Sequence, residues 1–192
     1  AGWAGTMAVN GGFVELGAGG TLNFSNVTLN NGGGLELSSN QTFDGLTTAT
    51  GSRIQINNGF TLTDNTAAPN TTTINSIIQG QGALSKTGNG TLALNGENSY
   101  TGGTTLAGGT VDVGSNTAFG TGAVTVTGAS TFQASGGNRT IANAVTNTAG
   151  FTVDGSNDLL MQGLISGAGT VTKQGTGALT LSGLNTYTGD TT

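Results

Sequence analysis

Residues 78–105 of this chain read IQGQGALSKTGNGTLALNGENSYTGGTT, and residues 165–192 read ISGAGTVTKQGTGALTLSGLNTYTGDTT. The two stretches align without a gap at an offset of 87 residues, and 15 of the 28 aligned positions are identical. The identical residues are mainly glycines, leucines, a lysine, an asparagine and a Tyr-Thr-Gly sequence. Repetition of turn residues and apolar residues at a fixed offset indicates a solenoid, in which one supersecondary unit is stacked on the next.

Short segments of alternating apolar and polar residues occur throughout the chain and indicate half-buried strands. Leu35-Glu36-Leu37, Ile54-Gln55-Ile56 and Val124-Thr125-Val126 are examples of this period of two. Glycine supplies 37 of the 192 residues, threonine 36 and asparagine 20, and the glycine and asparagine groups between strands suit turns with positive φ. No window has the spacing of an amphipathic helix. The alternation therefore predicts an all-β fold and argues against the disorder that such a composition otherwise suggests.

The repeat favours a β-solenoid over a sandwich, because successive strands of a sandwich occupy different environments. In a solenoid each coil meets the same neighbours, so equivalent residues are expected at the same angular position. The offset accommodates four coils of about 22 residues, and the whole chain roughly eight or nine coils. We expect one elongated rod, residues 1–192, with phenylalanines distributed along its core. The chain contains seven: Phe13, Phe24, Phe43, Phe60, Phe119, Phe132 and Phe151.

One segment interrupts this rhythm. Residues 64–73, DNTAAPNTTT, contain Pro69, the only proline of the chain, and proline interrupts a hydrogen-bonded ladder of strands. We predict that this segment is a protruding loop. Such loops often carry binding function in proteins with rigid scaffolds.

Catalytic and metal chemistry has little support in the sequence. The chain has no cysteine and no histidine, which excludes zinc sites of the usual kind and nucleophiles activated by histidine within these residues. Asp154 and Asp158 are the only close acidic pair. Their spacing faintly resembles a calcium loop, but the terminal Glu of that pattern is missing. We predict no catalytic residue, no cofactor-binding residue, no metal ligand and no enzymatic activity.

The charges argue against a nucleic-acid partner, which requires clustered basic side chains. The formal net charge is −5. The four cations, Arg53, Lys86, Arg139 and Lys173, are scattered along the sequence. We interpret all four as solvated surface charges.

Tyr100 and Tyr187 occur once in each repeat and have two interpretations. They could form part of a ligand platform, or their rings could pack over a turn while the hydroxyls stay in water. Their fixed distance after the lysine and glycines favours the structural interpretation. Asn98 and Asn185 are expected to bond to turn backbone, a common use of asparagine.

The pattern Lys-x-Gly-x-Gly-x-Leu-x-Leu-x-Gly-x-Asn-x-Tyr-Thr-Gly-x-Thr, at Lys86–Thr104 and Lys173–Thr191, resembles the passenger-associated transport repeat of bacterial autotransporters. The sequences GTVDVG at 109–114, AFGTG at 118–122 and RTIANAV at 139–145 resemble connecting sequence in such passengers. The resemblance implies a right-handed parallel β-helix, exported by type V secretion to the surface of Gram-negative bacteria through a C-terminal outer-membrane barrel. It also implies that the repeat assists secretion and folding.

We interpret the chain as a fragment of a longer passenger, because it opens at Ala1 and stops inside the second repeat. The translocator barrel and any targeting signal are expected elsewhere in the parent chain. The leading functional hypothesis is a structural and adhesive stalk. Its expected partner is a ligand on a host cell, on matrix or on a neighbouring cell, and rods could also associate laterally.

Two alternatives stay open. The rod could be the scaffold of a larger autotransporter enzyme, a protease or a polysaccharide-active protein, with its active site outside these residues. It could also be an ice-binding solenoid. Outward threonines favour ice binding, but their irregular placement along the sequence argues against the flat Thr-x-Thr array that ice binding requires.

Overall fold

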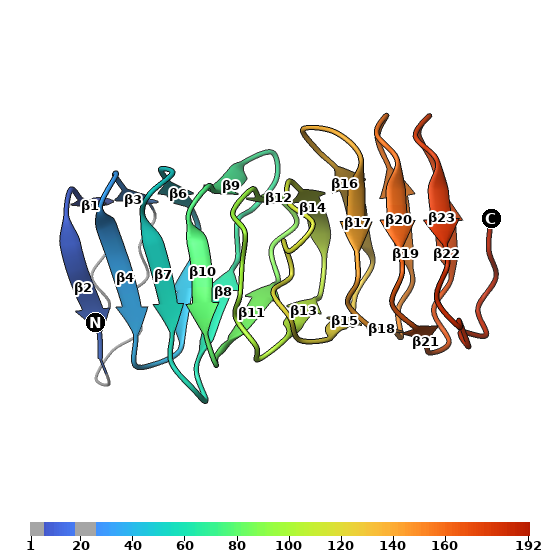
Figure 1. Ribbon diagram of the computed structural model, residues 1–192, viewed down its shortest axis with the longest axis horizontal. Helices are drawn as coiled ribbons and strands as arrows, with labels where there is room; N and C mark the ends of the chain where they lie inside the picture. The colour runs from blue at the N-terminus through green and yellow to red at the C-terminus, as the bar shows by residue number, and fades with distance from the viewer. Residues whose placement is uncertain (1–5, 18–25) are drawn as a thin grey trace.

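The computed structural model describes residues 6–17 and 26–192 and shows one rod of stacked coils (Figure 1). The rod is a parallel β-solenoid of about eight turns, as the sequence predicted. The described residues form 23 strands and no helix, so no helix long and apolar enough to cross a membrane is found among them. Phe24 lies outside the described residues.

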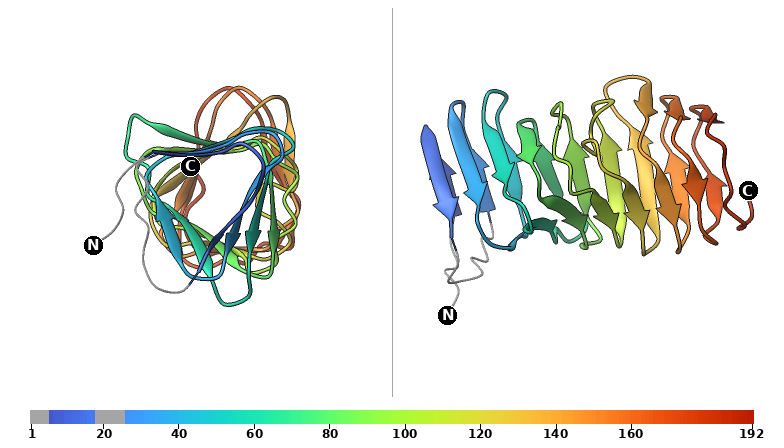
Figure 2. Two further views of the ribbon diagram at one scale, coloured as in Figure 1. Left: turned by 90° about the vertical axis from the view of Figure 1, so that its left-hand side faces the viewer. Right: turned by 60° about the horizontal axis from the view of Figure 1, so that its bottom comes forward.

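The described strands follow one another along the chain on three faces in a fixed order, which gives the rod a roughly triangular outline (Figure 2, left). Residues 95–103 and 114–123 form no strand, so two coils pass from face 1 to face 3 without one on face 2. Face 1 is a nine-stranded sheet that runs along most of the rod. Its strands are β1 (Thr6–Val9), β3 (Asn26–Leu29), β6 (Leu46–Thr48), β9 (Thr71–Ile74), β12 (Thr91–Leu94), β14 (Gly109–Val113), β16 (Ser130–Ala134), β19 (Phe151–Asp154) and β22 (Val171–Lys173).

Face 2 consists of two sheets, which follow one another along the same side of the rod (Figure 1). The four-stranded sheet contains β2 (Gly12–Leu16), β4 (Gly33–Leu37), β7 (Arg53–Ile56) and β10 (Ile77–Gly80). The three-stranded sheet contains β17 (Arg139–Ile141), β20 (Leu159–Met161) and β23 (Leu179–Leu181).

Face 3 is a seven-stranded sheet. Its strands are β5 (Gln41–Phe43), β8 (Thr61–Asp64), β11 (Ala83–Lys86), β13 (Thr104–Leu106), β15 (Val124–Val126), β18 (Val145–Asn147) and β21 (Ile165–Ser166).

The core follows from the alternation within each strand, which points every second side chain into the triangle. Leu35, Ile54 and Ile78 are in register on three successive strands of face 2, and all three are completely buried. Buried aromatic rings also meet between coils. The ring centroids of Phe119 and Phe132 are 5.7 Å apart, and those of Phe132 and Phe151 are 5.1 Å apart, in edge-to-face geometry. Such pairs add roughly 0.5–1.5 kcal/mol each to the burial of their area.

The coils between the two repeats are slightly shorter than the sequence suggested. Leu84, Thr104 and Val124 are register partners on three successive strands of face 3, and Val145 and Ile165 continue this column. The column advances by 20 or 21 residues per coil, and the expected 22 is wrong. An offset of 87 residues therefore exceeds four coils by about one face.

For this reason the two repeats do not occupy the same angular position, which corrects our expectation. Lys86 ends β11 on face 3, whereas Lys173 ends β22 on face 1. Leu92 lies in β12 on face 1, whereas Leu179 lies in β23 on face 2. The second repeat is displaced by one face of the triangle.

Glycines of the repeat allow consecutive coils to approach closely. A Cβ at Gly96 would lie 1.9 Å from the carbonyl oxygen of Ser76, and one at Gly183 would lie 2.2 Å from that of Gly163. Neither position tolerates a side chain without movement of the backbone. These glycines therefore belong to the coil geometry.

The outward threonines are more regular than their sequence spacing suggests. On face 3, one outward side chain per coil carries a hydroxyl group, and these side chains are in register through seven consecutive strands. The column contains Thr42, Thr63, Ser85, Thr105, Thr125, Thr146 and Ser166. Our expectation of irregular placement is wrong for this face, because small differences in turn length hide the register in the sequence. We call this column the hydroxyl ladder.

Candidate binding face

Asp154 and Asp158, near β19 and β20, accept hydrogen bonds from backbone and side-chain N–H groups. Asp154 Oδ1 accepts a bond from the backbone N–H of Gly155 at 2.7 Å. Asp158 accepts from Asn138 Nδ2 at 3.1 Å and from the backbone N–H of Ala178 at 2.8 Å. The described part of the chain contains no group of three or more His, Cys, Asp or Glu residues that could hold a metal ion. Asp154 thus bonds within its own turn, whereas the partners of Asp158 lie on neighbouring coils.

The interpretation of all four cations as solvated surface charges is wrong for Lys86. Its side chain is 0% exposed, and Nζ lies 3.3 Å from Oδ2 of Asp64 on the neighbouring strand. Nζ also donates a hydrogen bond to the carbonyl oxygen of Gly88. A buried ammonium group requires such partners, because an unpaired buried charge is costly. The sequence alone did not indicate the pair, since Asp64 lies on the preceding coil.

The segment predicted to protrude connects β8 to β9. Thr73 pairs with Thr47, so this coil is 26 residues long. In the two repeats, by contrast, the asparagine bonds to a residue of the neighbouring coil that is 20 positions earlier. Residues 67–71 are exposed, and the connection projects from the triangular outline (Figure 2, left, teal-green). At the base of the connection, the hydroxyls of Thr66 and Thr72 each lie 2.7 Å from Asp64 Oδ1. Binding by this segment stays a prediction.

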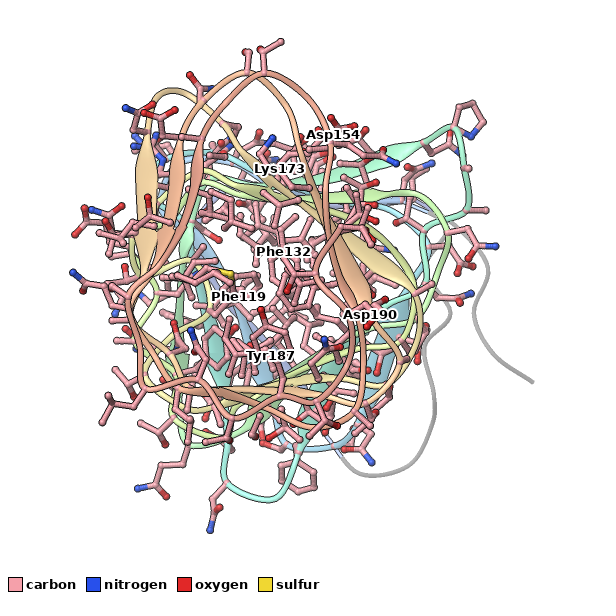
Figure 3. The ribbon with its side chains drawn as sticks, turned by 90° about the vertical axis from the view of Figure 1, so that its right-hand side faces the viewer. Phe119, Phe132, Asp154, Lys173, Tyr187 and Asp190 are labelled. Carbon is pink, nitrogen blue, oxygen red and sulfur yellow. The ribbon has the colours of Figure 1, made fainter. Side chains whose placement is uncertain are left out.

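The tyrosines of the repeats pack inward. Tyr100 is completely buried, and its hydroxyl lies 2.5 Å from that of Thr104. Burial raises the pKa of the Tyr100 phenol well above its ordinary value, and the hydrogen bond to Thr104 opposes part of this rise. Tyr187 packs partly buried against the core and makes the equivalent contact with Thr191 at 2.6 Å; it lies inside the outline of the coils in Figure 3. The Tyr100 ring is therefore inaccessible to a ligand, and its hydroxyl is not in water.

The asparagines of the repeats connect coils. Asn98 Oδ1 accepts a bond from the backbone N–H of Ile78 at 2.8 Å, and its Nδ2 donates to the carbonyl of Ala118 at 2.7 Å. Asn185 Oδ1 accepts from the N–H of Ile165 at 2.9 Å. Their partners lie one coil away instead of in the local turn. Each asparagine thus replaces a backbone acceptor in the stack.

The four-stranded sheet of face 2 has an unusual outer column. Phe13, Gly34, Arg53 and Ile77 are in register on successive strands. Phe13 is 51% exposed and Ile77 is 45% exposed. The guanidinium carbon of Arg53 lies 5.1 Å from the centroid of the Phe13 ring, a cation–π contact that spans Gly34. Two large apolar side chains and an arginine therefore lie in one line on the surface.

A second outer column lies beside the first and is polar. Glu15, Glu36, Gln55 and Gln79 are in register, and Gln79 Nε2 donates to Gln55 Oε1 at 2.9 Å. Asn57 Nδ2 donates to Glu36 Oε1 at 3.0 Å. These bonds order the amide and carboxylate groups along the face. We call the two columns together the face-2 patch.

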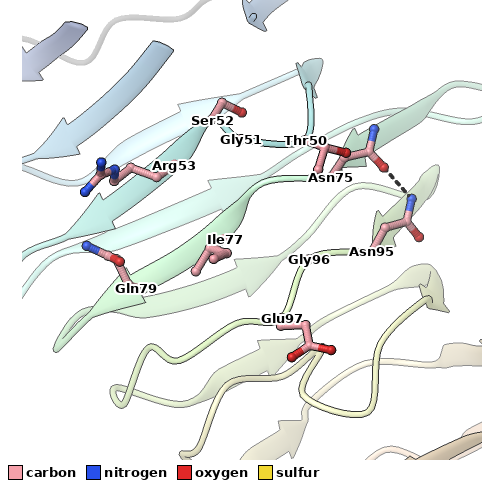
Figure 4. Close-up of a pocket in the computed structure, with 10 residues that line it drawn as sticks. All are labelled: Thr50, Gly51, Ser52, Arg53, Asn75, Ile77, Gln79, Asn95, Gly96 and Glu97. Carbon is pink, nitrogen blue, oxygen red and sulfur yellow. Dashed lines mark hydrogen bonds between the residues drawn. The ribbon is translucent and has the colours of Figure 1, made fainter. Parts of the chain in front are cut away.

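An open groove of about 610 Å³ lies where the face-2 patch meets the corner with face 1 (Figure 4). Arg53, Ile77 and Gln79 line it from the sheet. Asn75 and Asn95 line it from the corner, where Asn95 Nδ2 donates to Asn75 Oδ1 at 2.8 Å. The groove offers amides, a guanidinium group and an apolar side chain, which suits reversible binding of a polar ligand with some apolar surface.

The face-2 patch was not among the predicted features, although the sequence contains a signal for it. Glu15, Gln55 and Gln79 fix the outward phase of their strands. Phe13 and Ile77 have the same parity as these polar residues, two positions earlier in β2 and β10. Applying the phase of the alternation to each strand would have placed both apolar side chains outward.

Comparison with known proteins identifies two segments of the chain. Residues 84–113 and 171–192 match the family described as passenger-associated-transport-repeat. No curated protein matches the chain, and no solved structure matches it. The two matched segments confirm the repeat that the sequence resembled and are consistent with an autotransporter passenger domain.

Proposed function

We propose that this chain, which carries two passenger-associated transport repeats, is a rigid adhesive stalk of an autotransporter passenger. The stalk is exported through the outer membrane and presented at the bacterial surface. The observation that carries the proposal is that the backbone hydrogen bonds of each described strand are made with strands of the neighbouring coils. Every described strand pairs in parallel with a strand of a neighbouring coil, and both repeats add a side-chain bond to the neighbouring coil, between residues 20 positions apart.

This construction supports folding during export. A coil that emerges from the outer membrane finds a template in the preceding coil, whose edge offers unpaired backbone groups. Asn98 and Asn185 fix the register of such a pairing through the N–H groups of Ile78 and Ile165. The absence of cysteine also means that no disulfide has to be broken before the chain crosses a membrane.

The face-2 patch supports the adhesive part of the proposal. Exposed Phe13 and Ile77 supply apolar contact area, and Arg53 supplies a planar cation beside the groove. Aromatic and arginine side chains are enriched where proteins bind partners. The proposed partner is a polar surface ligand on a host cell, on matrix or on a neighbouring bacterium.

The test is surface display of the chain fused to an outer-membrane translocator barrel. We expect protease-accessible chain at the cell surface, and adhesion of the cells to host cells, matrix or one another. The double variant Phe13→Ala/Ile77→Ala should weaken adhesion about tenfold, which corresponds to about 1.4 kcal/mol. The matched control is Leu164→Ala/Leu184→Ala, which removes two other exposed apolar side chains and should leave adhesion unchanged.

Two results would contradict the proposal. Displayed cells that adhere no better than cells carrying the barrel alone would exclude the adhesive role. Retention of the fused chain in the periplasm would exclude the passenger role.

The hydroxyl ladder favours a second candidate function, ice binding. Its seven Thr and Ser side chains carry no charge and repeat once per strand, at the spacing of about 4.8 Å between neighbouring strands. The purified chain would then produce thermal hysteresis, and Thr125→Lys in the middle of the ladder would abolish it. Absence of hysteresis in the unmodified chain would reject this candidate.

A further inference from the structure

The ion pair of Lys86 and Asp64 is not required by either proposed function. It is the only salt bridge among the described residues, and both side chains are almost completely buried. The pair lies in an inward column of face 3, between Phe43 on the preceding strand and Leu106 on the following one. Phe43 and Leu106 are buried as well. Water is therefore excluded from both sides of the pair along the rod axis.

The polar contacts differ between the two oxygens of Asp64. Oδ1 lies 2.7 Å from each of the hydroxyls of Thr66 and Thr72. Oδ2 accepts no hydrogen bond, although it is buried and lies 3.3 Å from Lys86 Nζ. The carbonyl oxygen of Gly88 accepts a bond from Nζ and holds the amine at this site. One carboxyl oxygen is thus stabilised by donors, while the other faces a nitrogen nucleophile.

We propose that Lys86 and Asp64 form an intramolecular amide bond between their side chains. In the first step a proton passes from the ammonium group of Lys86 to Oδ2 of Asp64, 3.3 Å away. Nζ then attacks Cγ of Asp64, and the C–N bond forms. The bond between Cγ and Oδ2 breaks, and Oδ2 leaves as water with its own proton and one from Nζ. No oxidant, reductant or other reactant is needed.

The surroundings provide what this condensation requires. Folding holds the nitrogen and the carboxyl group together, which replaces a bimolecular encounter by an intramolecular one. The hydroxyl of Thr72 can donate to the negative charge that develops on Oδ1 during attack, while the hydroxyl of Thr66 donates to that of Thr72 at 2.5 Å. A small void, lined mainly by apolar side chains, lies beside Asp64.

The amide would join β8 to β11 at Asp64, the residue after which the projecting connection begins. It would be a covalent link between consecutive coils in a chain that has no cysteine. The second repeat offers an internal comparison. Lys173 pairs in register with Val153, so the same lysine of the motif has no carboxylate opposite it and is expected to remain an amine.

Tryptic mapping of the purified, denatured chain tests the proposal. The chain has four basic residues, Arg53, Lys86, Arg139 and Lys173, and trypsin does not cut after a lysine whose Nζ is acylated. We expect an intact mass lower by one water, no cleavage after Lys86, and normal cleavage after Lys173. The missing water should be found in the uncut fragment of residues 54–139, and fragmentation should assign it to a link between Asp64 and Lys86.

Two variants keep the result specific. Lys86→Arg and Asp64→Ala should each restore the full mass, and Asp64→Ala should also restore cleavage after Lys86. A full intact mass with cleavage after Lys86 in the unmodified chain overturns the proposal. A water loss that persists in Lys86→Arg overturns it too, because dehydration elsewhere, as at Asp154-Gly155, would then be the cause. The map of the unmodified chain decides the question even where a variant fails to fold.

Discussion

The two repeats have the same local structure on different faces of the rod. In both, an asparagine accepts a bond from a backbone N–H 20 residues earlier. In both, a tyrosine hydroxyl meets a threonine hydroxyl four residues later. Yet Lys86 lies on face 3, and Lys173 lies on face 1. The motif therefore specifies a sequence of strand, corner and strand, and not a particular face.

The three faces of the rod therefore accept the same backbone conformation of the repeat. A coil of about 20 residues has three similar sides, so a motif can begin at any corner and still pack correctly. The face determines which residue of the adjacent strand lies opposite each residue of the motif. Lys86 meets Asp64, whereas Lys173 meets Val153. The same motif thus acquires different side-chain energetics at its two places.

The largest expected difference concerns the lysines. Lys86→Met leaves the carboxylate of Asp64 buried without a cation, and we expect a loss of about 3–5 kcal/mol in the free energy of unfolding. Lys173 Nζ donates only to the carbonyls of Gln174 and Gly175 at the exposed surface, so Lys173→Met should cost less than about 1 kcal/mol. Urea denaturation of both variants measures the difference.

The double variant Lys86→Met/Asp64→Leu is the control for this prediction. It replaces the pair with apolar side chains and leaves no unpaired carboxylate, so it should be more stable than Lys86→Met. If Lys86→Met and Lys173→Met lowered the free energy of unfolding equally, the residue opposite each lysine would not determine its contribution to stability.

The asparagines provide the next comparison. Asn98 makes bonds to two neighbouring coils and is buried, whereas Asn185 makes one such bond and is partly exposed. Asn98→Ala leaves the N–H of Ile78 and the carbonyl of Ala118 without their partner. We expect a loss of about 2–3 kcal/mol for Asn98→Ala and about 1 kcal/mol for Asn185→Ala. Hydrogen exchange at Ile78 should accelerate in the first variant, and unchanged exchange there would contradict the assignment.

The tyrosine hydroxyls should show a smaller difference. Tyr100→Phe removes the partner of the buried Thr104 hydroxyl, which retains a longer contact of 3.5 Å with the carbonyl of Phe119. We expect a loss of about 1 kcal/mol. Tyr187→Phe should have almost no effect, because water reaches the contact between Tyr187 and Thr191. Denaturation midpoints of the two variants, measured side by side, test this; a larger loss for Tyr187→Phe would contradict it.

Much of the fold could be predicted from the sequence, because strand alternation and turn glycines are local signals. Leu92 and Leu94 are buried on β12 as their spacing indicates. The angular position could not be predicted in this way. It depends on the summed lengths of all intervening turns, and a difference of two residues per coil accumulates to a whole face over four coils.

The candidate site was less predictable, since its residues come together only through register. Phe13 and Arg53 are two coils apart, and their contact depends on Gly34 between them. The buried pair of Asp64 and Lys86 depends in the same way on the projecting connection between them. The sequence contains each residue, but a pairing across coils of unequal length has no local signature.

The smallest difference in stability is expected for a variant of Asp112, near the end of the matched segment 84–113. The matched segment 171–192 has no equivalent residue. Asp112 points outward from β14, is half buried, and has Ala93 and Gln133 as its register neighbours. Desolvation raises the pKa of its carboxyl above the ordinary value. The folded state therefore binds the proton more tightly than the unfolded state. The stability that this group contributes is complete below the unfolded pKa of about 3.9 and is lost as pH rises through the folded pKa.

Asp112→Asn should therefore leave stability unchanged near pH 3 and raise it slightly at pH 7. Urea midpoints measured across this range test the sign, and a variant that is less stable than the unmodified chain at pH 7 would show that the Asp112 carboxylate stabilises the coil instead.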